Sequence, residues 1–359
     1  MGKRNKITTR DIAEYTGLSQ STVSMVLSKK PGVSFSPDTI SIVEEAAKKL
    51  GYQKPKAGIK KKDHNLSSTI VIISPSYTNT YYNQLSHAIT TRAKEKGYTT
   101  FITTTLRDDS LEAEYMELLE RFNLAGIIFL SSPAKMGVAN KLSREIPCVL
   151  IGDNPSNCRF DCVELNNIWP AYMLGEHLIE LGHTHITFIA SPHSANRMNR
   201  DFRIQGLRNA LADHGIAEEN LELLSLSKTA YHLLPSQQQE YENGYRLTVQ
   251  AIENHSESTA FIGYNDTTAY GIMAALSDLG YRIPNDYSVC GFDNLPLSAM
   301  PQIALTTIEH STISKGHQAV DIIDRKIQSR KNASESTFTT RMEYDPKLIV
   351  RKSSGRCKR

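Results

Sequence analysis

Residues 17–27, GLSQSTVSMVL, predict a short helix with one face suited to reading bases. That face carries small, polar or soft side chains without charge: Gln20, Ser21, Ser24 and Met25. The opposite face carries three apolar residues at helical spacing, Val23, Val26 and Leu27. Hydroxyl and amide groups can hydrogen-bond to base edges, and a thioether can contact the thymine methyl group. We therefore expect the polar face to fit the major groove of duplex DNA.

Two further helices are expected to hold this one in place. The first begins at Thr8, where Asp11 supplies a capping box, and Gly17 ends it. The third begins at Ser36, with Pro37 in its first turn, and ends at Gly51. Two helices joined by a tight turn, the second short and polar outside, are typical of a helix-turn-helix. A small three-helix bundle that binds no DNA is the alternative.

The charge of the chain is unevenly distributed. Residues 1–65 hold thirteen Lys and Arg against six Asp and Glu, whereas the remainder holds 28 against 32. A basic arm on a mildly acidic body indicates a polyanionic partner for the arm. The alternative is a solubilising tail. Residues 54–66 are polar, basic and typical of a linker.

Beyond the linker, β-branched runs alternate with amphipathic helical patterns. The predicted strands include 69–74, 126–132, 148–152, 186–191 and 260–265. The predicted helices between them include 85–98, 171–183 and 203–215. Such alternation indicates parallel sheets with helices on both faces. About nine units are too many for one sheet, so we expect two doubly wound subdomains with a ligand-binding cleft between them.

Several functional classes are disfavoured by what the sequence lacks. No apolar run reaches the ~18 residues of a membrane span, and the polar start MGKRNKITTRDI does not resemble a signal peptide. We therefore expect a cytoplasmic protein with no membrane partner. No two of the twenty glycines are spaced G-x-G, and no G-K-[ST] motif occurs. A nucleotide-using enzyme is accordingly not expected, and neither is a cofactor.

The five cysteines are odd in number, and no pair is spaced C-x-x-C. We expect reduced, structural thiols. Cys158 and Cys162 could alternatively be bridged or bind metal, but no clustered histidines accompany them, so no metal site is expected.

Ordered sequence blocks along nearly the whole chain resemble the LacI/GalR family of bacterial transcription regulators. The head contains ITTRDIAEYTGLSQSTVSMVL and VEEAAKKLGY. The body contains LIELGHTHITFIA, RIQGLRNAL, GYNDTTAYGIMAALSDLGYRIPNDYSVCGFDN, LTTI and LIVRKSSG. The resemblance implies an all-α helix-turn-helix head, followed by an α/β body of two doubly wound subdomains that is similar to periplasmic binding proteins.

The resemblance also implies domain boundaries. We expect a DNA-binding head at 1–53, a hinge at 54–66 and an effector-binding domain at 67–355. Within the last, subdomain 1 is expected at about 67–165 and 295–325, and subdomain 2 at about 166–294 and 326–355.

The function implied by the resemblance is that of a homodimeric regulator. It would bind a near-palindromic, double-stranded operator at the nucleoid, under control of a small sugar or sugar phosphate in the cleft. Repression of genes for carbohydrate uptake or catabolism is the expected role. A transcriptional activator of the same family and a non-catalytic solute carrier are the alternatives, the latter disfavoured by the basic helical head.

The family's DNA contacts carry over onto nine residues. Base-reading positions match Gln20, Ser21 and Met25, and positions suited to phosphates match Thr8, Thr22, Ser24 and Lys29. The family's hinge helix places a leucine in the minor groove, but its Ala-Arg-x-Leu motif is absent here. Ile59 is the candidate wedge, and Lys60 adds phosphate attraction. Gly58 disfavours a hinge helix by about 1 kcal/mol relative to Ala.

The effector positions of the family match eight residues: Tyr81, Tyr82, Ser132, Arg197, Asn199, Arg203, Asn265 and Asp293. Their donors, acceptors and aromatic rings suit a polyhydroxyl ligand, and Arg197 would favour an acidic or phosphorylated one if it reached the cleft. We expect Asn265 to point into the cleft and Asp266 to cap the next helix. Arg203 could instead pair with a carboxylate, and Asp293 could be a turn residue. The family's Asp-Asn pair before the central helix is Asn166-Asn167 here.

Overall fold

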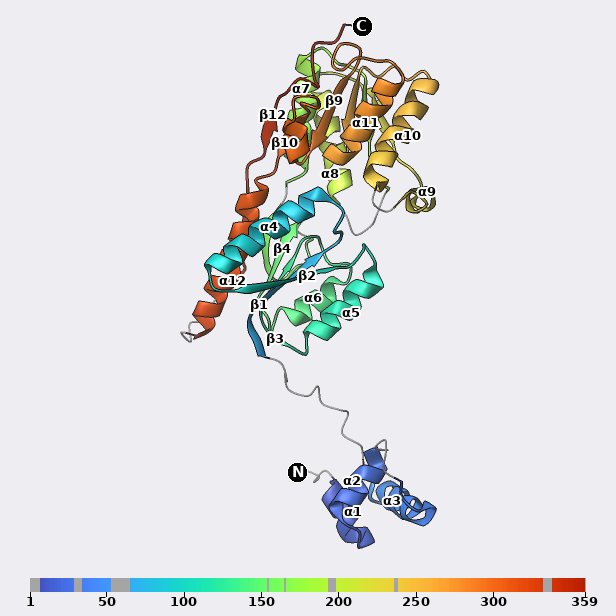
Figure 1. Cartoon of the computed structure of the whole chain (residues 1–359), viewed down its shortest axis with the longest axis vertical. Helices are drawn as coiled ribbons and strands as arrows, with labels where there is room; N and C mark the ends of the chain where they lie inside the picture. The colour runs from blue at the N-terminus through green and yellow to red at the C-terminus, as the bar shows by residue number, and fades with distance from the viewer. Residues whose placement is uncertain are drawn as a thin grey trace. The chain divides into compact units, whose positions relative to one another are not determined.

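A computed structural model describes residues 7–28, 34–52, 65–153, 155–164, 166–192, 198–235, 238–331 and 338–358. The chain divides into two compact units, Met1–Lys61 and Lys62–Arg359, called here the head and the body (Figure 1). Lys29, Ile59, Lys60 and Arg197 lie outside the described residues. No described helix is long and apolar enough to cross a membrane.

The head consists of the three predicted helices, α1 (Thr9–Thr16), α2 (Gln20–Ser28) and α3 (Pro37–Leu50). Thr8 and Asp11 form the predicted capping box, and Gly17 ends α1 with a φ of 72°. The N–H of Thr22 donates to Oγ of Ser19 over 3.1 Å, which confirms Ser19 as the cap of α2. The helices share one apolar core formed by Ile12, Ala13, Val23, Val26, Val43, Ala46 and Ala47.

The body contains two six-stranded sheets, which confirms the expectation of two doubly wound subdomains. The sheet of lobe 1 has the order β11-β5-β4-β3-β1-β2 and the sheet of lobe 2 has the order β12-β10-β9-β8-β6-β7. The lobe 1 strands are β1 (Asn65–Ser74), β2 (Thr99–Thr104), β3 (Asn123–Phe129), β4 (Cys148–Gly152), β5 (Asp161–Glu164) and β11 (Arg341–Glu343). The lobe 2 strands are β6 (Ile186–Ile189), β7 (Leu221–Leu224), β8 (Ala260–Gly263), β9 (Ser288–Phe292), β10 (Thr306–Glu309) and β12 (Lys347–Ile349). All pairings are parallel except that of β12 with β10.

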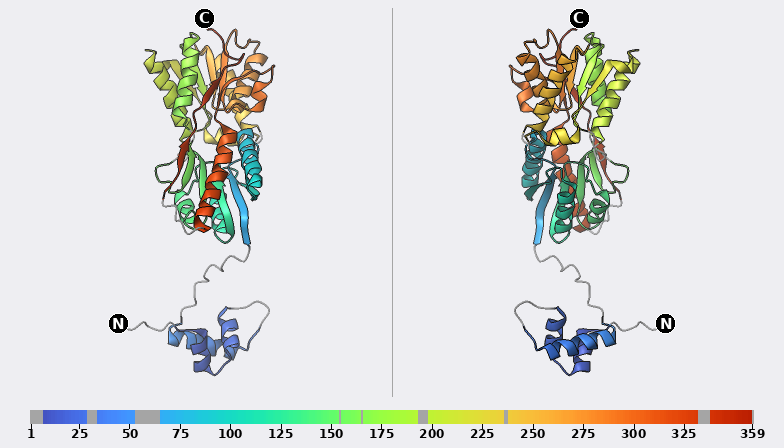
Figure 2. Two further views of the ribbon diagram at one scale, coloured as in Figure 1. Left: turned by 90° about the vertical axis from the view of Figure 1, so that its left-hand side faces the viewer. Right: turned by 90° about the vertical axis from the view of Figure 1, so that its right-hand side faces the viewer.

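Helices cover both faces of each sheet. In lobe 1, α4 (Thr80–Glu95) and α12 (Thr312–Lys331) lie side by side on one face (Figure 2), and α5 (Asp109–Leu119) and α6 (Met136–Leu142) pack on the other. In lobe 2, α7 (Ile168–Glu180) and α8 (Asn199–Asp213) cover one face, and α10 (Gln239–Glu253) and α11 (Asp266–Asp278) the other. Three short elements complete the lobe: η1 (Glu218–Asn220), α9 (Lys228–His232) and η2 (Pro296–Ala299). Alternate residues of the strands point to opposite faces, so each sheet has two apolar cores.

Two short strands correct the expected subdomain boundaries. The range 295–325 expected for subdomain 1 includes β10, but β10 pairs in parallel with β9 of lobe 2. The range 326–355 expected for subdomain 2 includes β11, but β11 pairs in parallel with β5 of lobe 1. The chain therefore crosses between the lobes before α7, before α12 and between β11 and β12. At the hinge boundary, residues 65 and 66 already belong to β1.

Helices α10 and α11 approach each other very closely. A Cβ added to Gly271 would lie 2.0 Å from the carbonyl oxygen of Tyr241, so only glycine permits this crossing. The close packing fixes the N-terminal ends of both helices, where Glu240 and Asn265 are located.

Candidate functional site

In the head, α2 presents the predicted polar face to solvent. Gln20, Ser21 and Ser24 are exposed and Met25 is partly exposed, whereas Val23 and Val26 are buried against the other helices. Nε2 of Gln20 donates to Oγ1 of Thr9 over 3.4 Å, so α1 helps to orient it. Thr22 is partly exposed at the start of the helix, next to its Ser19 cap. The described part of α2 thus offers an uncharged hydrogen-bonding surface.

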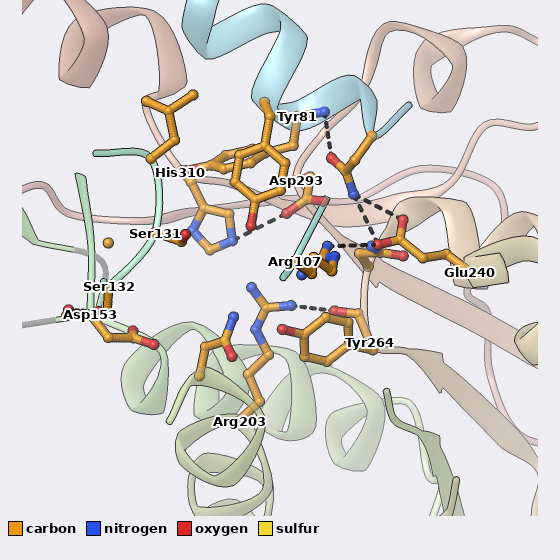
Figure 3. Close-up of a pocket in the computed structure, with 16 residues that line it drawn as sticks. Tyr81, Arg107, Ser131, Ser132, Asp153, Arg203, Glu240, Tyr264, Asp293 and His310 are labelled. Atoms are coloured by element: carbon orange, nitrogen blue, oxygen red, sulfur yellow. Dashed lines mark hydrogen bonds and ion pairs between the residues drawn. The ribbon is translucent and has the colours of Figure 1, made fainter. Parts of the chain in front are cut away.

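In the body, a cavity of about 730 Å³, its open mouth included, lies between the two lobes (Figure 3). Seven of the eight expected effector residues line it: Tyr81, Tyr82, Ser132, Asn199, Arg203, Asn265 and Asp293. Carboxyl ends of parallel strands from both sheets meet here, as in other doubly wound folds. The structure therefore brings together side chains that are more than 200 residues apart in sequence.

Arg203 is held by polar and aromatic contacts with other described residues. Its Nε donates to Oδ1 of Asn167 over 2.9 Å, and its Nη1 donates to the carbonyl oxygen of Tyr264. The guanidinium carbon lies 4.2 Å from the ring centroid of Phe292 and 4.9 Å from that of Tyr264. Asn167 also donates through Nδ2 to Oδ1 of Asp153 over 2.7 Å. The guanidinium is thereby fixed at the wall of the cavity.

The roles expected for Asn265 and Asp266 are partly reversed. Asn265 lines the cavity as expected, but its Oδ1 also caps α11 by accepting from N–H and Oγ1 of Thr268, each over 2.9 Å. Asp266 does not cap the helix. Its buried carboxylate accepts from three distant groups, the N–H of Leu295 (2.8 Å), Oγ of Ser298 and Oγ1 of Thr307 (both 2.5 Å). Burial raises the pKa of Asp266 to about 6 despite these donors.

Asp293 is a buried residue of the cavity wall and lies in the bend that follows β9. Its φ of 117° lies in a region that L-residues rarely adopt, which is a form of strain typical of functional sites. Burial raises its pKa well above the usual range, although the charge of Arg203 opposes this. His310 Nε2 lies 4.0 Å from Oδ1 of Asp293 and has no hydrogen-bond partner among the described residues, and neither has Oη of Tyr81. Burial and the positive charges of Arg203 and Lys315 lower the pKa of His310, so the imidazole is neutral.

On the other side of the cavity, Glu240 of α10 contacts lobe 1. Its two carboxylate oxygens accept from Nδ2 of Asn79 over 3.0 and 2.9 Å. Nη2 of Arg107 lies 3.6 Å from its Oε1, and Figure 3 shows these contacts as dashed lines. The Arg107 guanidinium also lies 5.9 Å from the ring centroid of Tyr82. These groups connect the lobes at the wall of the cavity.

Several lining residues are not predicted from the sequence: Asn79, Arg107, Ser131, Asp153, Glu240, Tyr264 and His310. Three of them had a usable signal, because carboxyl strand ends form ligand sites. Ser131 and Tyr264 lie at the ends of the predicted strands 126–132 and 260–265, and Asp153 follows directly after the predicted strand 148–152. Glu240 lies inside a helix and offered no such signal.

None of the described residues that line the cavity is a cysteine. All five cysteines are free thiols, and four of them are buried. Across the described ranges, no three His, Cys, Asp or Glu side chains are grouped to hold a metal ion.

Comparisons with known proteins give a consistent assignment. Residues 8–54 match the profile of bacterial regulatory proteins of the lacI family, and residues 176–354 match that of the periplasmic binding protein-like domain. The HTH-type transcriptional repressor PurR of Mannheimia succiniciproducens is 28% identical over 350 residues, covering 96% of this chain and 98% of PurR. The HTH-type transcriptional regulator DegA of Bacillus subtilis is 26% identical over 355 residues, covering 98% of both chains.

Solved structures share the fold. A LacI family transcriptional regulator from Enterococcus faecium with bound ribose has a TM-score of 0.68 at 23% identity, covering 81% of this chain and all of its own. The CelR–cellobiose complex has a TM-score of 0.66 at 20% identity, covering 97% of this chain and all of its own. With a helix-turn-helix head, a two-lobed body and relatives matched over almost their whole length, the chain belongs to the LacI family of bacterial transcriptional regulators.

Proposed function

We propose that this chain is a homodimeric repressor of carbohydrate uptake or catabolism genes, whose operator binding is controlled by a small carbohydrate in the inter-lobe cavity. The observation that carries the proposal is the combination, in one chain, of an exposed base-reading face on α2 and a polar cavity between the lobes. A protein that reads duplex DNA works where the chromosome is, so we place it in the cytoplasm at the nucleoid.

For DNA, we assign base reading to Gln20, Ser21 and Met25. Gln pairs well with adenine, and Met suits a thymine methyl group, whereas the helix has no Arg or Lys at these positions for the bidentate contact to guanine. Phosphate contacts are assigned to Thr8, Thr22, Ser24 and Lys29, with Ile59 and Lys60 of the hinge near the operator centre. Phosphate attraction of the basic arm makes the affinity depend on salt.

For the effector, the cavity offers the contacts that a polyhydroxyl ligand requires. Asp293 and Asn265 accept hydrogen bonds, Arg203 donates them, and the tyrosine rings supply apolar surface for the faces of a sugar. Ser132 and Asn199 also line the cavity, near Asp153. Related proteins have been solved with ribose, cellobiose and D-xylulofuranose, which supports a carbohydrate here.

A second copy of the chain is the expected partner of strand β2. This strand is an edge of its sheet, and Phe101 and Ile102 on it are 60% and 50% exposed. Leu106, just beyond it, is 59% exposed. An apolar sheet edge of this kind favours association, and two heads on one duplex would explain how uncharged recognition helices bind tightly.

The first test is selection of random DNA duplexes on the purified full-length protein at about physiological salt, without ligand. A two-fold symmetric enriched site supports the proposal, and a reporter carrying that site then distinguishes repression from activation. If no sequence is enriched, the selection is repeated with pooled sugars and sugar phosphates. A second failure would reject the repressor.

A further inference from the structure

The guanidinium groups that line the cavity already have carboxyl groups as neighbours. Of the described lining residues, two carry a guanidinium, Arg203 and Arg107. Arg203 interacts electrostatically with Asp153 and Asp293. Arg107 lies 3.6 Å from Glu240 and has no other carboxylate among its main electrostatic neighbours. Each guanidinium group of the described lining therefore already faces at least one carboxyl group, and Arg107 faces that of Glu240.

The position of Glu240 is fixed by Asn79. Both carboxylate oxygens lie within 3.0 Å of Nδ2 of Asn79. The amide is itself oriented, because its Oδ1 accepts from the N–H of Tyr81 over 3.0 Å as the cap of α4. The Glu240 side chain is only 17% exposed. The Glu240 carboxylate therefore has a fixed position in the cavity wall, next to Arg107.

The groups left for a ligand are suited to hydroxyls. Oη of Tyr81 and Nε2 of His310 are buried without a hydrogen-bond partner in the described structure. They lie on the side of the cavity where the Asp293 carboxylate is found, as Figure 3 shows. A hydroxyl, a neutral imidazole and a carboxyl group can exchange hydrogen bonds with an uncharged polyol, but they offer no positive charge to an anion.

We propose that Glu240 makes the cavity selective for uncharged, hydroxyl-rich ligands by neutralising Arg107, so that phosphorylated and carboxylated ligands are rejected. This inference rests on the proposed function, because it specifies the effector of the same cavity. It narrows the choice between a sugar and a sugar phosphate, which the sequence leaves open. An anion bound in this part of the cavity would need the positive charge of Arg107, and the Glu240 carboxylate already neutralises that charge.

The test measures inorganic phosphate binding to the full-length protein by calorimetry, at constant ionic strength and pH 7.5. E240Q keeps the shape of the side chain and removes its charge. We expect E240Q to bind phosphate at least about tenfold more tightly than wild type, as one charge-assisted hydrogen bond would give. E242Q is the matched control, because Glu242 lies on the same helix and pairs with Arg246 at the surface. Its phosphate affinity should equal that of wild type.

Arg107→Met in the E240Q background locates the gained site. The added affinity should disappear in this double variant, whereas phosphate bound by the basic head is the same in all variants. E240A repeats the test with a different side chain, and circular dichroism establishes that each variant is folded.

Two results would overturn the inference: wild type binding phosphate at an Arg107-dependent site as tightly as E240Q, or folded E240Q and E240A gaining no affinity. Neither depends on DNA, so failure here is distinguishable from failure of the operator selection.

Discussion

The side chain of Arg203 donates through Nε to Oδ1 of Asn167, 2.9 Å away. The same amide donates through Nδ2 to Asp153 at the end of β4. Asn167 thus connects a guanidinium of lobe 2 with a carboxylate of lobe 1, at the first chain crossing between them. The neighbouring Asn166 has a different role, because its Oδ1 accepts from the N–H groups of Ile168 and Trp169 at the start of α7.

Asn167→Ala should impair both stability and ligand binding. It leaves buried donors and acceptors of Arg203 and Asp153 without this partner, which costs about 1–3 kcal/mol of the free energy of unfolding. Sugar affinity should also fall, by about tenfold or more, because Arg203 is no longer oriented. Urea denaturation and calorimetry measure the two effects. Asn166→Ala should cost about 1 kcal/mol of helix capping and leave sugar affinity unchanged. Equal losses of sugar affinity in both variants would contradict the role of Asn167 in orienting Arg203.

The Asp153 carboxyl group should make stability depend on pH. Burial raises its pKa to about 6, against the opposing effects of Arg203 and Asn167. The folded protein then binds more protons than the unfolded chain between about pH 4 and 6, so this stabilisation is present at pH 4 and is lost as pH rises through 6. The Asp153→Asn variant has no carboxyl group to titrate and therefore lacks this pH-dependent stabilisation. Wild type should therefore lose about 1–3 kcal/mol relative to D153N between pH 4 and 7. If the stabilities of wild type and D153N change by the same amount between pH 4 and 7, the raised pKa of Asp153 is contradicted.

Gly271→Ala should separate α10 from α11. The new Cβ would meet the carbonyl oxygen of Tyr241 at 2.0 Å, and a backbone atom cannot move aside as a flexible side chain can. We expect a loss of at least about 2 kcal/mol in the free energy of unfolding. Sugar affinity should fall as well, because Glu240 and Asn265 shift with their helices. Gly137→Ala is the control, since its Cβ would meet no atom within 4 Å; alanine there should change stability by less than about 1 kcal/mol.

Gln20→Ala should change which bases are preferred without destabilising the head. Gln20 is exposed and makes one long side-chain contact, with Thr9. A lost bidentate base contact relaxes specificity at one operator position by about 1–3 kcal/mol. Selection of random duplexes with both proteins shows this directly. Ser41→Ala, on the exposed side of α3, should retain the wild-type preference. If Gln20→Ala selects the same DNA sequences as wild type, Gln20 does not read bases.

Local features of the fold were predictable from sequence because their causes are local. Thr8 with Asp11, and Pro37 after Ser36, mark helix starts within a single turn, and Gly17 and Gly51 mark helix ends. The central strands β1, β3, β4, β6 and β8 were recognisable by their apolar, β-branched runs. The resemblance to a family predicted eight effector residues, and seven of them line one cavity in the structure.

Contacts between distant segments could not be predicted in the same way. Asn79 and Glu240 are 161 residues apart, and nothing in either local pattern specifies the other. Whether Asn265 or Asp266 caps α11 depends on Leu295, Ser298 and Thr307, which hold Asp266 elsewhere. The three-residue strands β11 and β12 show no periodicity long enough to reveal the sheet that each one joins.

The placement of α12 has a consequence for the order in which the protein can fold during synthesis. Ala319, Val320, Ile322 and Ile323 of this helix complete the apolar core over the face of the sheet built from β1, β3, β4 and β5. All of lobe 2 from α7 to β10 is translated between those strands and this helix. A ribosome-bound chain must therefore hold the first sheet with part of one apolar face uncovered until α12 emerges. Lobe 1 is begun first but is completed only after most of lobe 2 has been translated, and its exposed face is the point at which chaperone binding or aggregation would occur.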